Sequence, residues 1–285
     1  MLVVLKKPKK TKMKSKKIMI TGAGSGLGKG MVMGLAKKGH HVIAAVHVWE
    51  QKSQLLKELT DSKLNKNVEI IKLDITDDMD CLNAYNYDID ILVNNAGMGY
   101  SGPVAEMPVG LLREVMEVNV FSSLEFSQPF ISQMVEKKKG KIIFVSSIAG
   151  LTTSPYLGAY NASKHALESI AQSLRDELHE FGVSVATINP GPYETGFNDR
   201  MYENFKQWYD DDIFYTDAKT IEKAGKALLD NQFDPQEMID KMVEIVPKDS
   251  HPFRTILPAK FEKQCKEYQQ AQYDLKCDEI LESKK

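Results

Sequence analysis

The sequence predicts an α/β fold, a doubly wound parallel sheet in a single domain with a helical C-terminal flap. Short apolar runs rich in β-branched residues alternate with segments of helical periodicity five or six times along the 285 residues. Continuously apolar strands are typical of sheets covered on both faces, and alternation with helices favours parallel pairing through right-handed crossovers. A glycine-rich turn also joins the first apolar run directly to the first helical segment.

Six apolar runs are the predicted strands. In chain order they cover residues 17–21, 41–46, 68–73, 89–94, 141–146 and 183–189. The segments between them, such as GKGMVMGLAKKG and HALESIAQSLRDELHEFG, repeat apolar residues every three or four positions, which predicts amphipathic helices. The second of these two helices is expected to end near Gly182. Because no repeat or linker divides residues 18–193, we predict that they form one core.

The character of the chain changes after Tyr193. Residues 193–217 concentrate aromatic side chains in an irregular stretch, which predicts either a flap that closes over an apolar substrate or a satellite core beneath a loop. Two helices (218–231 and 235–246), an extended segment FRTIL and a final helix from about Pro258 are expected to follow. We therefore assign residues 194–285 to a substrate loop and a helical extension of the same domain.

Composition and charge limit the possible classes of protein. With 42% hydrophobic and 27% charged residues, and no run near the eighteen or so apolar residues of a membrane helix, the chain is expected to be cytoplasmic and without a membrane partner. The three cysteines are scattered and the six histidines lack ligand spacing, so neither a disulfide framework nor a metal site is predicted.

Charge is unevenly distributed along the chain. Residues 1–17 contain eight lysines and no acid, which predicts a basic flexible tail. Such an arm could bind nucleic acid or an anionic membrane surface, or it could be a solvated tail ahead of an alternative start at Met13. Removing these eight lysines from the overall net charge of −2 leaves −10 for the body, which argues against nucleic acid as a partner.

The stretch TGAGSGLG, residues 21–28, has the glycines that a phosphate-binding turn needs. Gly22 permits the tight turn, Gly26 lets the backbone approach a pyrophosphate, and Gly28 allows close packing of helix on strand. The helix N-terminus then faces the anion, with Ser25 and Leu27 beside it. A Walker motif is excluded, because Ala23 and Gly30 stand where that motif requires a glycine and a hydroxyl residue. The turn predicts a dinucleotide cofactor in a Rossmann fold.

The residue at the end of the second strand is expected to determine which of the two nicotinamide coenzymes is preferred. An acid there would bind the ribose 2′-hydroxyl of NAD, whereas a cation would accept the 2′-phosphate of NADP. The sequence has His47 and no carboxylate at this point, which favours NADP(H) over NAD(H). Asp74, with Ile75, follows the third strand and is placed to touch the adenine. The alternative is that Asp74 caps the following helix.

Tyr160 and Lys164, in the stretch YNASK, lie four residues apart at the start of a predicted helix. This spacing places both side chains on one face. A neighbouring ammonium stabilises a phenolate and lowers the pKa of the phenol, as a catalytic tyrosine requires. A surface pair without chemistry is the alternative for this stretch alone.

Taken in order, the motifs resemble the single-domain branch of the short-chain dehydrogenase/reductases, which has a Tyr-x-x-x-Lys active site. They are TGAGSGLG, LDIT (73–76), NNAG (94–97), VNVF around Asn119, SSIAG (146–150), YNASK and NPGPYET (189–195), and they span residues 18 to about 197. The resemblance implies catalytic roles for Asn119, Ser147, Tyr160 and Lys164. It also implies that Asn95, Ala96, Gly97, Tyr160, Lys164, Pro190, Gly191, Tyr193 and Thr195 contact the cofactor.

The same resemblance implies an NAD(P)-dependent oxidoreductase that interconverts a secondary alcohol and a ketone or aldehyde by hydride transfer. The long tail implies a hydrophobic small molecule as substrate, and the family's habit of pairing through the YNASK helix implies a homodimer or homotetramer. Asn94 follows Asp74 by only twenty positions, a shorter interval than is usual in the family, so a stunted helix is expected there. The alternatives are a cofactor-binding scaffold or sensor without turnover and a 3-oxoacyl-carrier-protein-type ketoreductase. Taken alone, Ser147 could be a turn residue and Asn119 a helix kink.

Overall fold

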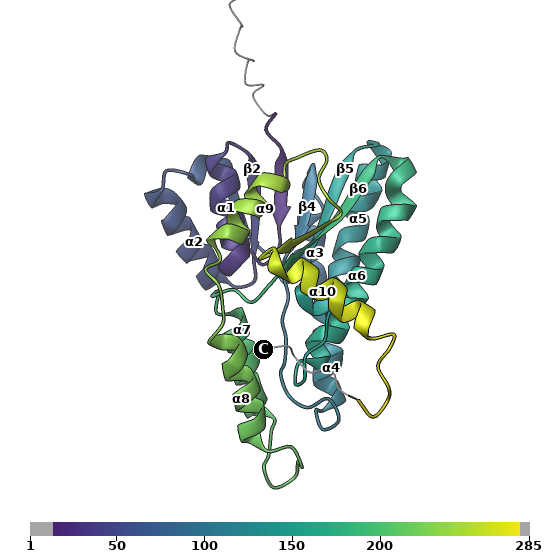
Figure 1. Ribbon diagram of the computed structural model, residues 1–285. Coiled ribbons are helices and arrows are strands. Elements are labelled where there is room, and N and C mark those ends of the chain that lie inside the picture. The colour runs from purple at the N-terminus through teal and green to yellow at the C-terminus, as the bar shows by residue number, and fades with distance from the viewer. Residues whose placement is uncertain (1–13, 280–285) are drawn as a thin grey trace, which may run out of the picture.

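A seven-stranded, all-parallel sheet forms the centre of the molecule (Figure 1). The computed structural model describes residues 14–279. The strand order is β3-β2-β1-β4-β5-β6-β7. The chain therefore builds outward from β1 in one direction and from β4 in the other, so a crevice opens between these two neighbours at the carboxyl end of the sheet.

The elements have the following bounds. The strands are β1 (Lys17–Ile20), β2 (His41–Val46), β3 (Val68–Lys72), β4 (Ile91–Asn94), β5 (Gly140–Val145), β6 (Val183–Pro190) and β7 (Arg254–Leu257). The helices are α1 (Gly26–Lys37), α2 (Trp49–Asp61), α3 (Asp78–Ala84), α4 (Val109–Met116), α5 (Ser122–Glu136), α6 (Gly158–Leu178), α7 (Phe197–Glu203), α8 (Ala218–Leu229), α9 (Gln236–Ile245) and α10 (Lys260–Ala271). A π-helical turn, Glu117–Phe121, joins α4 to α5.

The predicted parallel sheet is confirmed, and the structure changes the description of two segments. Arg254–Leu257 is a seventh strand that pairs with β6, so part of the C-terminal extension belongs to the sheet. The predicted tail over residues 1–17 lies mostly outside the described residues. Its last residues are folded, because Lys17 begins β1 and the Lys16 ammonium lies 2.8 Å from an Asp249 carboxylate oxygen. The stunted helix is α3, with seven residues.

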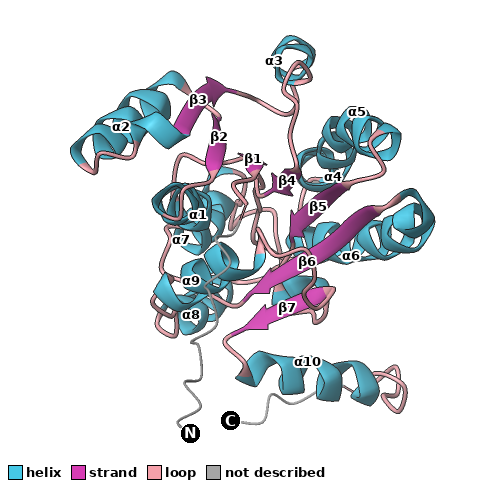
Figure 2. Ribbon diagram, turned by 90° about the horizontal axis from the view of Figure 1, so that it is seen from above, coloured by secondary structure: helices cyan, strands magenta, loops and turns pink. Residues whose placement is uncertain are grey.

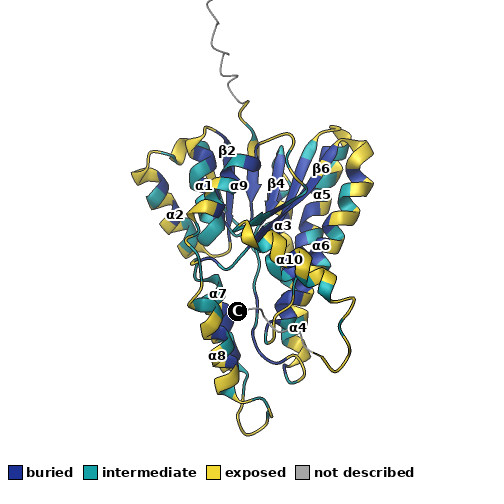
Figure 3. Ribbon diagram, in the orientation of Figure 1, coloured by how far each residue is buried: buried dark blue, intermediate teal, exposed yellow. Residues whose placement is uncertain are grey.

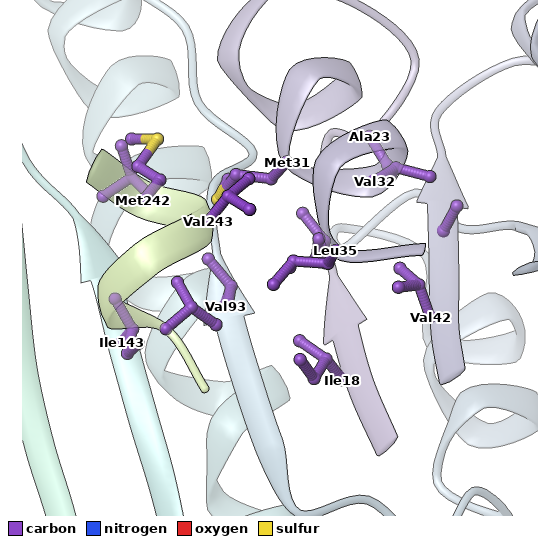
Figure 4. Close-up of a cluster of buried hydrophobic side chains, with 14 of the residues drawn as sticks. Ile18, Ala23, Met31, Val32, Leu35, Val42, Val93, Ile143, Met242 and Val243 are labelled. Atoms are coloured by element: carbon purple, nitrogen blue, oxygen red, sulfur yellow. The ribbon is translucent and has the colours of Figure 1, made fainter. Parts of the chain in front are cut away.

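Helices cover both faces of the sheet (Figure 2). On one face, α1 and α9 pack together over β1 and β4, and Met31, Leu35, Met242 and Val243 are fully or almost fully buried there (Figure 4). A methyl group on Gly34 would lie 2.4 Å from a Val243 methyl carbon, so the glycine permits the close approach of α1 and α9. On the other face, α3, α5 and α6 cover the strands.

Aromatic side chains cluster at the centre of the second face, and we expect their removal to destabilise the protein. Phe130 is fully buried, and its ring centroid lies 5.3 Å from that of Phe126 and 5.6 Å from that of Tyr85. We expect Phe130→Ala to lower the free energy of unfolding by about 3–5 kcal/mol, because it removes buried apolar contacts and leaves a cavity. Phe181→Ala, at a half-exposed phenylalanine, is the control and should change the free energy of unfolding by less than about 0.5 kcal/mol. Urea denaturation of both variants measures the difference.

Below the carboxyl end of the sheet, α7 and α8 form a separate lobe opposite α4 (Figure 1), with exposed outer surfaces (Figure 3). The helix α7 is the next element after β6, so this lobe begins at the carboxyl end of the sheet and faces a ligand bound in the crevice. Among residues 14–279, no helix has both the length and the apolar character needed to cross a bilayer.

Candidate active site

The glycine turn after β1 is pressed against the segment after β4. Gly22 has φ +62°, and a Cβ there would lie 2.8 Å from Ala96 Cα. At Gly28, a Cβ would lie 2.4 Å from the carbonyl oxygen of Gly22. The Asn95 amide braces this contact by donating to the carbonyl oxygens of Thr21 (3.0 Å) and Gly22 (3.1 Å). A side chain is therefore excluded at Gly22 and at Gly28, and the backbone of the turn can approach a ligand closely.

The N-terminus of α1 is open to an anion. Ser25 is the N-cap residue, and its side chain makes no capping hydrogen bond to the first turn. The first N–H groups of a helix lack intrahelical partners and carry partial positive charge. These features fit the pyrophosphate of a dinucleotide.

One cavity of about 890 Å³ joins this turn to the YNASK helix. Every residue predicted to contact the cofactor lines it, namely Gly22, Ser25, Gly26, Leu27, Gly28, His47, Asp74, Ile75, Asn95, Ala96, Gly97, Tyr160, Lys164, Pro190, Gly191, Tyr193 and Thr195. Ser147 lies on the same wall, whereas Asn119 does not. The volume lies in the upper part of the range for ligand pockets.

His47 and Asp74 form a pair at one end of the cavity. Their Nε2 and Oδ2 atoms are 3.1 Å apart. Burial raises the pKa of Asp74, but hydrogen bonds from Thr76 and His47 outweigh it and hold this pKa below its ordinary value. Asp74 does not cap α3, because Asp77 is the N-cap residue and accepts from the N–H of Asp80. The capping alternative for Asp74 is therefore wrong.

Tyr160 and Lys164 are buried on one face of α6, as the spacing predicts. The Lys164 Nζ lies 5.6 Å from the centroid of the Tyr160 ring and donates to the carbonyl oxygen of Val145 at 3.0 Å. The ring of Phe197 covers Tyr160 with centroids 5.7 Å apart. Both ionisable groups are thus largely removed from water.

Burial has a larger effect on this pair than their mutual interaction. It raises the pKa of Tyr160 to about 12, although a hydrogen bond with Ser147 opposes the rise. It lowers the pKa of Lys164 to about 8, although Glu168 opposes the fall. The expected lowering of the phenol pKa by Lys164 is therefore not found in the protein alone, because removal from water disfavours both charged forms.

Ser147 is a turn residue whose side chain also lines the cavity. Its hydroxyl accepts from the N–H of Ala149 at 3.1 Å, which caps a short 3₁₀ helix, Ile148–Gly150. It also faces the cavity beside Tyr160. Its turn geometry therefore fixes the hydroxyl near the phenol.

Asn119 lies behind the cavity wall in the π-helical turn. Its Oδ1 accepts from the N–H of Met98, and its Nδ2 donates to the carbonyl oxygen of Met98 and to the hydroxyl of Ser163. These bonds use the side chain's acceptor and both of its donor hydrogens. Asn119 thus braces the segment after β4 against α6, and its side chain has no free donor for the cavity.

Comparison with known proteins agrees with this arrangement. The family model for short chain dehydrogenases matches residues 16–206. The chain belongs to the short-chain dehydrogenase/reductase family. It is accordingly an NAD(P)-dependent oxidoreductase that interconverts an alcohol and a carbonyl compound.

Relatives of this short-chain dehydrogenase/reductase cover most of its length. The uncharacterized oxidoreductase YusZ of Bacillus subtilis is 34% identical over 83% of this chain and 86% of its own. The 3-ketodihydrosphingosine reductase of Bacteroides thetaiotaomicron is 31% identical over 84% and 86%. Human retinol dehydrogenase 8 is 26% identical over 83% and 79%.

Solved structures confirm the Rossmann fold. A short-chain dehydrogenase/reductase from Burkholderia phymatum in complex with NAD has a TM-score of 0.75 at 20% identity and covers 95% of this chain and 99% of its own. A short-chain dehydrogenase from Streptomyces avermitilis has a TM-score of 0.74 at 24% identity, covering 92% and 95%.

The aromatic stretch of this dehydrogenase/reductase divides between the two alternatives considered for it. Phe197 and Met201, one helical turn apart on α7, line the cavity. Trp208, Tyr209 and Phe214 instead pack against one another in edge-to-face and tilted arrangements, with ring centroids 5.5–6.3 Å apart. The first pair therefore has the position expected of a flap, whereas the other three form a satellite cluster.

Sequence reasoning assigned no role to several residues of the site. Thr21 accepts from the N–H groups of Asn95 and Ala96, and Gln51 accepts from the N–H of His47. Thr21 stands inside the glycine motif, so its position was a usable signal. For Gln51, which lies on α2, the sequence offered none.

Proposed function

We propose that Tyr160 is the acid/base of this enzyme, with Ser147 and Lys164 as its partners. The observation that carries the proposal is the meeting of these three side chains on a wall of the cavity that also contains the phosphate turn. When bound, the nicotinamide supplies the site that accepts or donates hydride. During alcohol oxidation the substrate O–H proton passes to the Tyr160 oxygen, and during carbonyl reduction Tyr160 returns a proton to the substrate oxygen.

The partners have separate tasks. Ser147 holds the substrate oxygen by hydrogen bonding. Lys164 offsets the negative charge of the phenolate that forms when Tyr160 gives up its proton. Asn119 retains a role as a brace for the segment that faces the nicotinamide.

The substrate that fits the cavity is a hydrophobic alcohol or ketone. Leu157, Phe197, Met201 and Leu228 line the cavity and belong to the apolar cluster around Tyr160. Relatives named for retinol and for 3-ketodihydrosphingosine support the same class. The test follows nicotinamide absorbance with a panel of hydrophobic ketones and alcohols, alongside coenzyme binding measured by protein fluorescence.

The outcomes of this assay separate the three candidates. Turnover of hydrophobic substrates supports the proposal. Coenzyme binding without turnover across the panel would indicate a scaffold or sensor. Activity restricted to carrier-bound 3-oxoacyl groups would indicate the ketoreductase alternative.

We propose NADP(H) as the preferred coenzyme, because Asp74 is engaged by His47 at the end of the cavity. The Asp74 carboxylate lies 3.1 Å from the His47 imidazole, and no acid stands at the end of β2 to bind the ribose 2′-hydroxyl of NAD. His47→Asp should reverse the preference, weakening NADPH and strengthening NADH binding, each by roughly tenfold. Fluorescence titration with both coenzymes measures this, and equal affinities of the unaltered protein for both would refute the argument. His41→Asp, on β2 outside the cavity lining, is the matched control.

We propose a homodimer or homotetramer in the cytoplasm. Phe121 and Val109, on the helical segments before α6, are more than half exposed, and contact with a second copy would cover them. The three cysteines are free, as is usual in a reducing compartment. Size-exclusion chromatography with light scattering measures the assembly, and fractionation of cells measures the location.

A further inference from the structure

A buried carboxylate lies one helical turn beyond Lys164. Glu168 on α6 is 3% exposed. Its Oε2 accepts from Nε (3.2 Å) and from a terminal nitrogen (2.7 Å) of Arg254 on β7. Its Oε1 accepts from the amide of Asn189 at 2.6 Å. A charge so completely removed from water requires such partners, and here each carboxylate oxygen has one.

The same network reaches the proposed catalytic serine. The Asn189 amide that donates to Glu168 also donates to the carbonyl oxygen of Ser147 at 3.0 Å. The Oδ1 of Asn189 is held in turn by the hydroxyl of Thr187 at 3.1 Å. Two strands and one helix are therefore tied together behind Ser147. Asn189 is fully buried, so no water competes for these bonds.

Glu168 also affects the charge of Lys164. Burial lowers the pKa of Lys164, and the Glu168 carboxylate opposes that fall. From other elements, the Val145 carbonyl oxygen of β5 accepts from the ammonium at 3.0 Å and Gly97 lies nearby, and neither group ionises. The charged group of β7 is Arg254, which pairs with Glu168. On α6 itself, Tyr160 and Glu168 are its ionisable neighbours.

We propose that Glu168, held by Arg254 of the C-terminal extension, is a positioning residue that fixes Ser147 through Asn189 and keeps Lys164 cationic. The inference rests on the proposed roles of Ser147 and Lys164. Glu168 does not line the cavity, so it acts through these residues and not on the substrate. This proposal also gives β7 a role in the site, because β7 carries Arg254, which lies 86 positions from Glu168 in the chain.

The experiment compares Glu168→Gln and Glu168→Asp with the unaltered protein. The glutamine keeps the shape and removes the charge, whereas the aspartate keeps the charge. Glu177→Gln, at an exposed position of the same helix, is the matched control. Three quantities are measured for each: the melting temperature, the pH profile of kcat/KM, and the dissociation constant of NADPH against pH by protein fluorescence.

We expect Glu168→Gln to lower kcat at least tenfold and to move the alkaline limb of both pH profiles down by about one unit. The direction follows because Lys164 without its carboxylate neighbour loses its proton at lower pH. Glu168→Asp should restore the position of the limb, and Glu177→Gln should change none of the three quantities. If Glu168→Gln does not fold, the double variant with Glu168→Gln and Arg254→Met is measured instead. It removes both charges and leaves no unpaired cation, and the same shift of the pH profiles is expected.

Activity loss with unmoved pH profiles in Glu168→Gln would overturn the inference and reduce Glu168 to a structural residue. An equal shift in Glu168→Asp would also overturn it. Failure of the proposed function is recognised separately, as absent turnover in the unaltered protein. In that case the pH dependence of NADPH binding still tests whether Glu168 supports the charge of Lys164.

Discussion

Replacing Tyr160 with phenylalanine is expected to lower kcat by about 10³-fold, because the phenol is the proposed route for the substrate proton. The ring of phenylalanine preserves the packing of Tyr160 against Phe197 and the ammonium of Lys164, so the fold and the coenzyme site should remain intact. NADPH affinity should therefore change by less than about threefold. Steady-state kinetics and fluorescence titration measure the two quantities.

The control for this change is Tyr202→Phe. Tyr202 is also buried and belongs to the same apolar cluster as Tyr160, but it does not line the cavity. It should leave kcat within about twofold of the unaltered value. Undiminished turnover by Tyr160→Phe on a substrate that the unaltered protein converts would contradict the assignment of the acid/base.

A single methyl group in the phosphate turn is expected to abolish useful coenzyme binding. In Gly28→Ala the new Cβ would lie 2.4 Å from the carbonyl oxygen of Gly22 and 2.6 Å from Nδ2 of Asn95. Neither neighbour is the free end of a flexible side chain, so the turn must move away from the segment after β4. We expect at least a hundredfold weaker NADPH binding, roughly 3 kcal/mol, together with a lower melting temperature.

Gly110→Ala is the matched control, since a Cβ at Gly110 has no neighbour within 4 Å. Gly110 lies in α4, where alanine should stabilise the helix by about 0.5–1 kcal/mol. Isothermal calorimetry with NADPH and thermal denaturation compare the two. Normal NADPH affinity in Gly28→Ala would show that the turn does not need its close contact with Gly22 and Asn95.

The parallel sheet and most of its strands were accessible from the sequence because local patterns encode them. Runs such as HVIAAV are apolar on both faces, and β2 occupies His41–Val46, the residues predicted. The helix carrying Tyr160 was equally clear, and it ends ahead of Gly182, which has φ +74°. The strand at Arg254–Leu257 was recognised only as extended. Its four residues carry little pattern, and its partner β6 lies more than sixty residues earlier.

The motif residues that line the cavity were also accessible from the sequence, because the motifs stand where parallel strands end. The hydrogen bonds that these residues make could not be predicted from the sequence. Asn119 was predicted to have a catalytic role, and in the structure its amide bonds the backbone of Met98 and the hydroxyl of Ser163. Nothing in the stretch VNVF shows that direction, because it depends on how the π-helical turn meets α6.

The sequence alone determined the periodicities, the glycine turn and the spacing of Tyr160 and Lys164, since each is a property of neighbouring residues. Only the tertiary structure decided the charges of the site. The pKa of a buried group depends on its distance from water and from partners that arrive from remote segments. Arg254 and Asn189 thus reach Glu168, and Glu168 acts on Lys164, through a packing that no short stretch of sequence contains.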